Sequence, residues 1–385
     1  MTLCLDRRSA MATVMAGALV PGFIPAALAD ESRVTDMTPY AAIALQITAR
    51  SVERAADRDA VEAQVLAHIG EVEASLRSAR VFVEQYGGAR VKLAVLPEYL
   101  FTSYPGRIGV ADFAARAGFA IDGPEYAALG AAAQRLGLFL AGNAYERDAS
   151  FPGFYFQASF IVAPSGEVVL RYRRLLSMFA PSPHDVWEKY LDRYGLEGVF
   201  PVARTEIGNL AAIASEEILY PEIARAHALR GAEVFVHSSS EIGSPLSTPK
   251  DIAKRARAFE NMAYVVSANT AGISGTAMPL ASADGNSQVI DWKGRIIAQS
   301  GDGETFTAFA EIDIAALRAA RRVPAMTNML ARQRPTLFAK AYAGAEAFHR
   351  ADGLIEQGKP RVPDRDYFLR AQEEVIERLI GAGII

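Results

Sequence analysis

Hydrophobic positions along the chain fall into blocks that predict buried strands separated by amphipathic helices. Residues 41–46 form an apolar run of strand length, and apolar residues recur at helical spacing in the segment 61–83. Two glycines end that helix, and a second apolar run at residues 91–96 stops shortly before Glu98. The pattern therefore predicts an amphipathic helix packed on a sheet of buried strands.

Later segments add hairpins and further strand-helix units. Residues 156–163 and 167–172 flank a Pro-Ser-Gly turn, which predicts a β-hairpin. Residues 287–291 and 295–298 flank a Trp-Lys-Gly turn in the same way. Between the hairpins the pattern predicts strand 210–214, a helix from Pro221, strand 233–237, helix 249–262 and strand 264–269. This order indicates an α/β protein with a mixed sheet, whose helices lie either between paired sheets or outside them.

The chain divides into a large core and two terminal segments. With 385 residues, of which 51% are hydrophobic, it has ample material for one large core, which we place at residues 38–320. Residues 321–385 contain several prolines and end in the helix-like segment 366–380. We expect this C-terminal extension to wrap a neighbouring element or a partner subunit.

The N-terminus has the order of an export signal. Arg7 and Arg8 precede an almost uncharged stretch at residues 9–28, and an Ala-Leu-Ala sequence lies directly before Asp30. Residues 1–29 are therefore predicted to be a signal peptide, and the paired arginines favour the twin-arginine type. We expect a periplasmic or secreted protein; the alternative is a cytoplasmic protein with an N-terminal tail.

Charge narrows the class of partner. The 44 acidic and 40 basic residues are interspersed and give a net charge of -4, so no basic stripe indicates a nucleic acid or an anionic membrane. We expect a small-molecule ligand and no membrane span in the mature chain. The His and Asp residues show no metal-ligand spacing, and no glycine-rich phosphate loop follows a strand, so no metal and no cofactor are expected.

Three polar residues stand at the ends of apolar strands. Glu98 follows the strand 91–96, Arg174 follows the second hairpin strand, and Ser215 follows the strand 210–214. Active sites of layered α/β proteins are built at strand ends, so the joint placement predicts a site. The only cysteine of the chain, Cys4, lies in the predicted signal peptide. Covalent chemistry in the mature protein would therefore have to use an alcohol.

The segments around these residues carry a family resemblance. They read LPEY at residues 96–99, GEVVLRYRR at 166–174 and ASEEILYPEIAR at 214–225. With supporting segments across residues 41–318, the chain resembles the nitrilase superfamily of carbon-nitrogen hydrolases. The resemblance implies an αββα sandwich of two mixed sheets flanked by helices, and a Glu-Lys-Cys triad. It also implies a homodimer or larger homo-oligomer, with the helix from Pro221 and the C-terminal extension as candidate contacts.

The chain departs from the family pattern at two of the three triad positions. Glu98 is unchanged, whereas Arg174 takes the lysine position and Ser215 takes the cysteine position. Glu146 falls where many family members place a second glutamate, which positions the lysine and the substrate. A thiol has a pKa of about 8.5 and an alcohol lies near the value of about 15.7 for water, a difference of roughly 10 kcal/mol for full deprotonation. Arg174 keeps the charge but does not release a proton.

Two functions remain open for such a site. In the first, the protein is an amidase-type hydrolase of a small amide or carbamoyl compound: Ser215 attacks, Glu98 is the base, and Arg174 with a backbone amide near Glu216 stabilises the oxyanion. In the second, it is a catalytically inactive member that binds a small acid or amide, or that serves as an assembly subunit. A plain Glu98–Arg174 ion pair, or Glu146 as a partner of Arg174, would fit the second function.

Two histidines are further candidates for substrate binding. His237 follows an apolar strand and precedes a run of serines, so it is either a wall of the pocket or a base for Ser215. His184 lies in the loop after the lysine motif, and we place it at the rim of the pocket.

Overall fold

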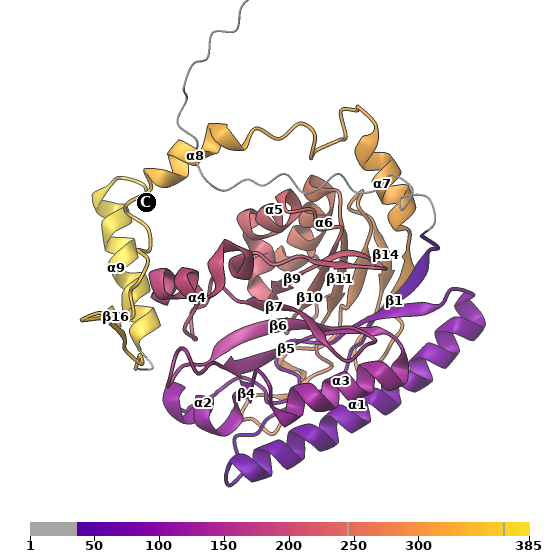
Figure 1. Ribbon diagram of the computed structural model, residues 1–385, viewed down its shortest axis with the longest axis horizontal. Helices are drawn as coiled ribbons and strands as arrows, with labels where there is room; N and C mark the ends of the chain where they lie inside the picture. The colour runs from indigo at the N-terminus through magenta and orange to yellow at the C-terminus, as the bar shows by residue number, and fades with distance from the viewer. Residues whose placement is uncertain (1–36, 245, 365) are drawn as a thin grey trace, which may run out of the picture.

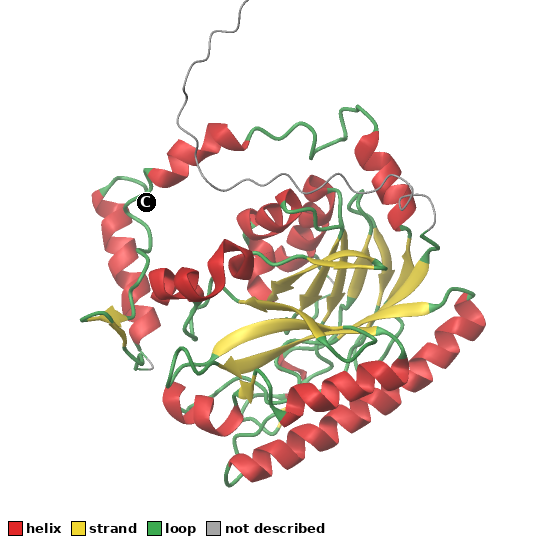
Figure 2. Ribbon diagram, viewed as in Figure 1, coloured by secondary structure: helices red, strands yellow, loops and turns green. Residues whose placement is uncertain are grey.

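Two β-sheets face each other in the protein, and helices cover the outer face of each sheet (Figures 1 and 2). The computed structural model describes residues 37–385 apart from 245 and 365. The predicted signal peptide at residues 1–29 lies outside the described residues. The described chain thus has the αββα layers that the resemblance implied, with the helices outside the paired sheets and not between them.

The first sheet contains the glutamate and lysine motifs. Its order is β15-β1-β3-β5-β6-β7, with β4 added beside β5. Strands β1, β3 and β5 run parallel, and β6, β7 and β15 pair antiparallel with their neighbours. The strands are β1 (Tyr40–Ala44), β3 (Val91–Val95), β4 (Phe119–Ala120), β5 (Phe139–Arg147), β6 (Phe156–Val162), β7 (Val168–Arg173) and β15 (Phe309–Ile312).

The second sheet contains the serine motif. Its order is β14-β13-β11-β10-β9-β8, with β9, β10 and β11 parallel. Its strands are β8 (Ala203–Thr205), β9 (Gly208–Ala214), β10 (Val234–Ser238), β11 (Tyr264–Ala268), β13 (Gln288–Ile290) and β14 (Ile296–Gln299). Two short pairs complete the described strands: β2 (Ala49–Arg50) with β12 (Ile273–Ser274), and β16 (Ile355–Glu356) with β17 (Lys359–Pro360).

Helices pack on each sheet from outside. The first sheet is covered by α1 (Arg58–Gly87), α2 (Val110–Ala117) and α3 (Pro124–Leu136), and the second by α5 (Pro221–Leu229) and α6 (Pro249–Asn261). The remaining helices are η2 (Pro183–Val186), α4 (Trp187–Val199), η3 (Ser215–Leu219), η4 (Leu280–Ser282), α7 (Ile314–Arg322), α8 (Pro335–Ala343) and α9 (Tyr367–Gly381).

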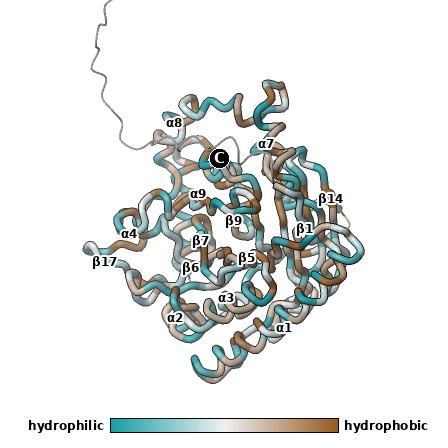
Figure 3. Tube along the Cα trace, turned by 45° about the vertical axis from the view of Figure 1, so that its right-hand side comes forward, coloured by the Kyte–Doolittle hydropathy of each residue, from teal (hydrophilic) through white to brown (hydrophobic). Residues whose placement is uncertain are grey.

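Helix α1 shows why the hydrophobic pattern of the sequence predicted the positions of helices and strands. Asp57 caps its start by accepting from the Ala60 backbone N–H at 2.9 Å, and Gly88 ends it in the left-handed region at φ 75°. Hydrophobic and hydrophilic positions alternate along the helix (Figure 3), and the buried ones face the sheet. The predicted helix 61–83 is therefore confirmed, with about one further turn at each end.

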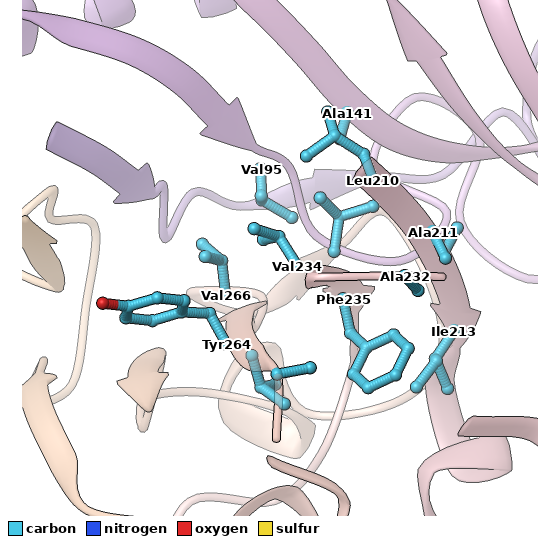
Figure 4. Close-up of a cluster of buried hydrophobic side chains, with 14 of the residues drawn as sticks. Val95, Ala141, Leu210, Ala211, Ile213, Ala232, Val234, Phe235, Tyr264 and Val266 are labelled. Carbon is cyan, nitrogen blue, oxygen red and sulfur yellow. The ribbon is translucent and has the colours of Figure 1, made fainter. Parts of the chain in front are cut away.

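The core between the sheets is apolar and closely packed. Alternate residues of facing strands meet there, and Figure 4 shows Val95 of the first sheet near Leu210, Val234 and Val266 of the second. These side chains have no exposed surface. Burial of this kind stabilises a fold by roughly 25 cal/mol per Å² of apolar surface removed from water. The rigid sandwich fixes where the strands end, and therefore where the polar residues after them lie.

The C-terminal extension packs on its own chain. After α7 it runs by way of α8 to α9, which lies near α4 (Figure 1). The Asp352 backbone N–H donates to His184 O at 2.9 Å, and the Leu354 N–H donates to Asp185 O at 2.9 Å. Leu354 is fully buried in a small aromatic cluster with Phe151. The neighbouring element that the extension wraps is thus the segment around α4. Among residues 37–385 other than 245 and 365, no helix has the length and apolar composition needed to cross a bilayer.

Candidate active site

The two sheets are joined by hydrogen bonds at the edge where β3, β9 and β10 end. The Ser238 hydroxyl donates to Leu96 O at 2.8 Å, and the Glu98 N–H donates to Ser239 O at 3.2 Å. Because β9 and β10 are parallel and in register, Ser215 leaves its strand beside the same serines. The sandwich thus brings two of the predicted residues, Glu98 and Ser215, to one edge.

Glu98 is fixed by bonds to both of its carboxylate oxygens. The Gln157 side chain donates to Oε1 at 2.6 Å, and the Ser240 hydroxyl donates to Oε2 at 2.6 Å. Tyr99 is hydrogen-bonded to the same Ser240 hydroxyl. With Glu98 only 2% exposed, these neutral partners hold a buried carboxylate in one orientation.

Arg174 lies beside Glu98, with Gln157 between them. The Arg174 Nη1 donates to Gln157 Oε1 at 2.8 Å and is 3.7 Å from Glu98 Oε1, while Nε donates to Leu176 O at 2.6 Å. Its Nη2 is paired with the Glu216 carboxylate. The ion pair between Glu98 and Arg174 that the sequence suggested is therefore present and long. Gln157, the second residue of β6, was not predicted.

Ser215 stands at a backbone turn that few non-glycine residues adopt. Its φ is 48°, in the left-handed region, where β9 gives way to η3. Such a conformation costs of order 1–3 kcal/mol, and sharp strand-to-helix turns of this type present the nucleophile in several hydrolases. The residue is 6% exposed and lines a cavity. The geometry suits a hydroxyl that is displayed to a small ligand.

His237 contacts the backbone of Ser215 and not its hydroxyl. Its Nε2 lies 2.8 Å from Ser215 O, and its Nδ1 lies 2.8 Å from the Ser267 hydroxyl. Since a carbonyl only accepts, Nε2 carries the proton and Nδ1 accepts from Ser267. Burial lowers the pKa of His237 well below 6.5, so the ring stays neutral. The histidine is fully buried behind the cavity and does not line it; it holds the Ser215 carbonyl and does not hydrogen-bond the Ser215 Oγ.

Glu217 ties the serine motif to the lysine motif. Its buried carboxylate accepts from the Tyr172 hydroxyl at 2.7 Å and from the backbone N–H groups of Leu175 and Leu176 at 2.7 and 3.0 Å. Burial raises the pKa of Glu217. These bonds fix the chain on either side of Arg174 relative to Ser215. The carboxylate therefore sets the distance between two predicted site residues.

Lys250 is a residue of the site that the sequence pattern did not reveal. Its Nζ lies 3.5 Å from Ser215 Oγ and 3.4 Å from Ser239 Oγ. It is the second residue of α6, which begins at Pro249 after a capping box formed by Thr248. Burial lowers the pKa of Lys250, while nearby carboxylates act in the opposite direction. The chain has seven lysines among its 40 basic residues, so a lysine after a serine-rich strand end was a signal that could have been noticed.

These residues line one cavity of about 650 Å³. Glu98, Gln157, Arg174, Ser215 and Lys250 belong to its polar part, to which Glu216 and Ser240 also contribute. Its other walls include the aromatic side chains Tyr99, Tyr104, Tyr145, Tyr155, Phe179 and Phe368. A site with a few convergent polar groups inside apolar walls is typical of small-molecule binding. One wall residue, Phe368, comes from α9, so the C-terminal extension contributes to the cavity.

Like His237, Glu146 and His184 lie outside this cavity. Glu146 accepts from Arg171 at 3.1 Å and from Arg173 at 2.8 Å, so the expectation that it partners Arg174 is wrong. The physical reason is strand parity: positions 171 and 173 share one face of β7 and residue 174 does not. His184 lies against Trp187 and binds the C-terminal extension through its backbone carbonyl. Across the described ranges, no group of three or more His, Cys, Asp or Glu side chains is placed to hold a metal ion.

Comparison with known sequences identifies a matching family model and curated relatives. The carbon-nitrogen hydrolase model matches residues 41–322. A protein of Pseudomonas protegens named "Hydrolase in pqqF 5'region" is 31% identical over 180 residues, which cover 47% of this chain and 59% of that protein. A formamidase of Pseudomonas syringae pv. tomato is 29% identical over 182 residues, covering 47% of this chain and 49% of the formamidase. The chain thus spans about half the length of these curated relatives.

Comparison with solved structures shows the same fold. The carbon-nitrogen hydrolase of Helicobacter pylori aligns with a TM-score of 0.57 at 21% identity, over 79% of this chain and 98% of the other. Saccharomyces cerevisiae Nit3, a member of the nitrilase superfamily, aligns with a TM-score of 0.55 at 19% identity, over 75% and 95%. An amidase from Nesterenkonia sp. aligns with a TM-score of 0.52 at 17% identity, over 78% and 96%. The solved structures share the fold, and the family model, which matches most of the chain, shows that this protein belongs to the carbon-nitrogen hydrolase family.

Proposed function

We propose that this protein hydrolyses a small amide or carbamoyl compound through an ester intermediate on Ser215. Ser215 attacks the carbonyl carbon, the amine leaves, and water then hydrolyses the ester. Glu98 promotes removal of the proton from the Ser215 hydroxyl, either as the base itself or by assisting a neighbouring side chain that accepts the proton. The observation that carries the proposal is the placement of Ser215, at a strained strand end in a cavity of about 650 Å³ that Glu98 also lines, with Lys250 Nζ 3.5 Å from its hydroxyl.

Charge stabilisation of the oxyanion is assigned to Arg174 and to the backbone N–H of Glu216. Arg174 lines the cavity, and its guanidinium carries a permanent positive charge. A developing oxyanion gains most from donors that are already fixed before the reaction, and three different acceptors orient this guanidinium. The names of the relatives, a formamidase among them, agree with a small amide as the substrate class.

The alternative function is a catalytically inactive member that binds a small acid or amide. One observation favours it: the Arg174 guanidinium already donates to Gln157, Leu176 and Glu216 within the protein. A guanidinium that is engaged in this way can hold a carboxylate ligand at its remaining donors without any reaction. The two functions differ in whether Ser215 is modified during a turnover.

The N-terminal segment supports a proposal about location. We infer that residues 1–29 direct export and that the hydrolase works in the periplasm or outside the cell, because paired arginines, an uncharged stretch and an Ala-x-Ala sequence follow in order. The mass of the protein recovered from the periplasm and the medium tests this inference. A protein that keeps residues 1–29 and stays in the cytoplasm would contradict it.

Hydrolysis assays on the purified protein test the function. The substrates are a panel of amides, carbamoyl compounds, nitriles and esters, and the variants are Ser215→Ala and, as a matched control, Ser78→Ala on the exposed face of α1. We expect turnover of at least one amide or carbamoyl compound, unchanged in Ser78→Ala and reduced by at least about 10³-fold in Ser215→Ala. Equal activity in the wild type and Ser215→Ala, or no activity on the whole panel, contradicts the proposal and favours the binding function.

A further inference from the structure

The hydroxyl of Ser215 has a basic neighbour, and that neighbour is a lysine. Lys250 Nζ lies 3.5 Å from Ser215 Oγ, at the long end of the hydrogen-bond range. Glu98 uses its two oxygens to accept from Gln157 and Ser240, and among the described residues no hydrogen bond joins it to Ser215. In structures without substrate, catalytic hydrogen bonds are often long and shorten only when the substrate binds. The side chain placed to take the proton of Ser215 is therefore Lys250.

We propose that Lys250 is a further catalytic residue, which accepts the proton of Ser215 Oγ in the attack and returns protons in the later steps. The assignment rests on the proposed function, and it names the neighbouring side chain through which the charge of Glu98 acts. It replaces a glutamate-cysteine proton transfer by a serine-lysine pair, an arrangement known among hydrolases of other folds. It also explains how an alcohol can be activated where the family pattern has a thiol.

The surroundings of Lys250 favour an amine that can lose its proton. The charged groups that face it are Glu98, Glu241, Glu216 and Lys254. Lys254 is already paired with Glu241, so the charge of that carboxylate is largely neutralised. Burial, which is the largest effect, lowers the pKa of Lys250.

The start of helix α6 acts in the same direction as burial. Lys250 is the second residue of this helix of 13 residues, and the positive end of the helix dipole disfavours an ammonium group there. Side chains in a helix also lean towards its N-terminus, which directs Lys250 at the strand ends. Its flexible stem lets the amine follow the reacting atoms between steps.

The proton and electron balance of the cycle is complete without another reactant. Neutral Lys250 takes the proton of Ser215 as Oγ bonds to the carbonyl carbon, and the oxyanion faces Arg174. The ammonium of Lys250 gives that proton to the leaving nitrogen while the C–N bond breaks, which leaves an ester and a neutral lysine. Lys250 then takes a proton from water as hydroxide adds to the ester, and it returns the proton to Ser215 Oγ when the C–O bond breaks.

Glu98 keeps a defined part in this cycle. It is the first carboxylate among those that raise the pKa of Lys250, so it stabilises the ammonium formed in each proton transfer. Gln157 and Ser240 hold it in place for this role. Glu98 thus takes no part in the proton transfers, and the proton moves between Ser215, Lys250, the leaving nitrogen and water.

The test uses the full chain and the variants Lys250→Met and Lys250→Arg, with Lys340→Met on the exposed face of α8 as the control. Two rates are measured between pH 6 and pH 10: hydrolysis of the substrate found in the panel, and phosphonylation of Ser215 by a fluorophosphonate, followed by intact mass. The second rate needs no known substrate. Thermal unfolding of each variant checks that it folds, and Lys250→Gln serves if Lys250→Met does not.

We expect both rates to fall by at least about 100-fold in Lys250→Met and in Lys250→Arg, because arginine keeps the charge but cannot accept the proton. The wild-type rates should rise with pH and level off below the ordinary lysine value of about 10.4, and this dependence should be absent in the variants. Near wild-type rates in Lys250→Arg would show that residue 250 contributes only a positive charge that holds a ligand, and they overturn the assignment. Near wild-type rates in Lys250→Met overturn it as well. A wild-type protein without Ser215-dependent reaction overturns the proposed function itself.

Discussion

Two buried clusters of acidic and basic residues lie next to the strand β7, and only one of them belongs to the cavity. In the first, Glu146 accepts from Tyr126, Arg171 and Arg173. In the second, Glu98 accepts from Gln157 and Ser240 and lies 3.7 Å from Arg174. The two carboxylates are almost equally inaccessible, with exposures of 0% and 2%. Burial and charge are therefore not what separates a site from a structural ion pair.

The two clusters differ in how completely the carboxylate is neutralised and in whether it lines the cavity. Glu146 has its partners on β7 and on α3, and two arginines neutralise its charge. Glu98 has neutral hydrogen-bond partners and a cation 3.7 Å away, and it lines the cavity of about 650 Å³. Positive φ values occur at Tyr99 and Ser215, directly beside the second cluster. A carboxylate with incomplete neutralisation, next to strained backbone and open space, is the better indication of chemistry.

The largest effect should come from Glu146→Gln. Removal of this charge leaves Arg171 without its anion and Arg173 with Asp148 alone, and loss of one partner of a buried pair costs about 3–5 kcal/mol. Chemical denaturation should show that loss in the free energy of unfolding. The hydrolysis rate per folded molecule should stay within a few-fold of the wild type, because this cluster lies outside the cavity. A selective loss of turnover with unchanged stability would contradict the structural role.

The sequence predicted the fold well because local signals and global topology agree in it. Turn triplets marked both hairpins, and strand-length apolar runs marked β3, β9, β10 and β11 with errors of one or two residues. The strand-end positions of Glu98, Arg174 and Ser215 also followed from the linear pattern. Positions of this type are fixed by chain order alone, since parallel strands end at a common edge.

The rest of the site depends on distances between segments that are remote in sequence. Lys250 and Ser215 are 35 positions apart, and only the packing of α6 on the second sheet brings them together. Gln157 reaches Glu98 across 59 positions through the pairing of β5 with β6. The partner of Glu146 was predictable in principle, because alternate residues of a strand share a face, and the expectation failed by one position.

The second largest effect should come from Glu98→Gln, the same change in the other cluster. Turnover should fall by at least about 100-fold, or about 2.7 kcal/mol at 1.36 kcal/mol per tenfold, because the anion that stabilises the ammonium of Lys250 is lost. The free energy of unfolding should change by less than about 1 kcal/mol, since the amide oxygen can still accept from Gln157 while the new NH2 group donates to the Ser240 hydroxyl. Stability and turnover are measured on the same preparation as for Glu146→Gln. If Glu98→Gln lowers the free energy of unfolding as much as Glu146→Gln does, the proposed difference between the two clusters is wrong.

The smallest effect is expected for Glu216→Gln, the third carboxylate of the comparison. The Glu216 side chain is 38% exposed and pairs with Arg174 at the edge of the cavity, and exposed ion pairs contribute about 1 kcal/mol or less. Turnover should therefore fall by no more than about fivefold, because the change leaves the backbone N–H assigned to the oxyanion in place. The turnover assay, run with and without added salt, measures this effect. Salt should reduce the difference in turnover between the variant and the wild type. A loss of turnover as large as that of Glu98→Gln would show that the Glu216 side chain, and not its backbone N–H, faces the reacting atoms. It would also show that contact with solvent does not weaken the effect of a charge in this cavity.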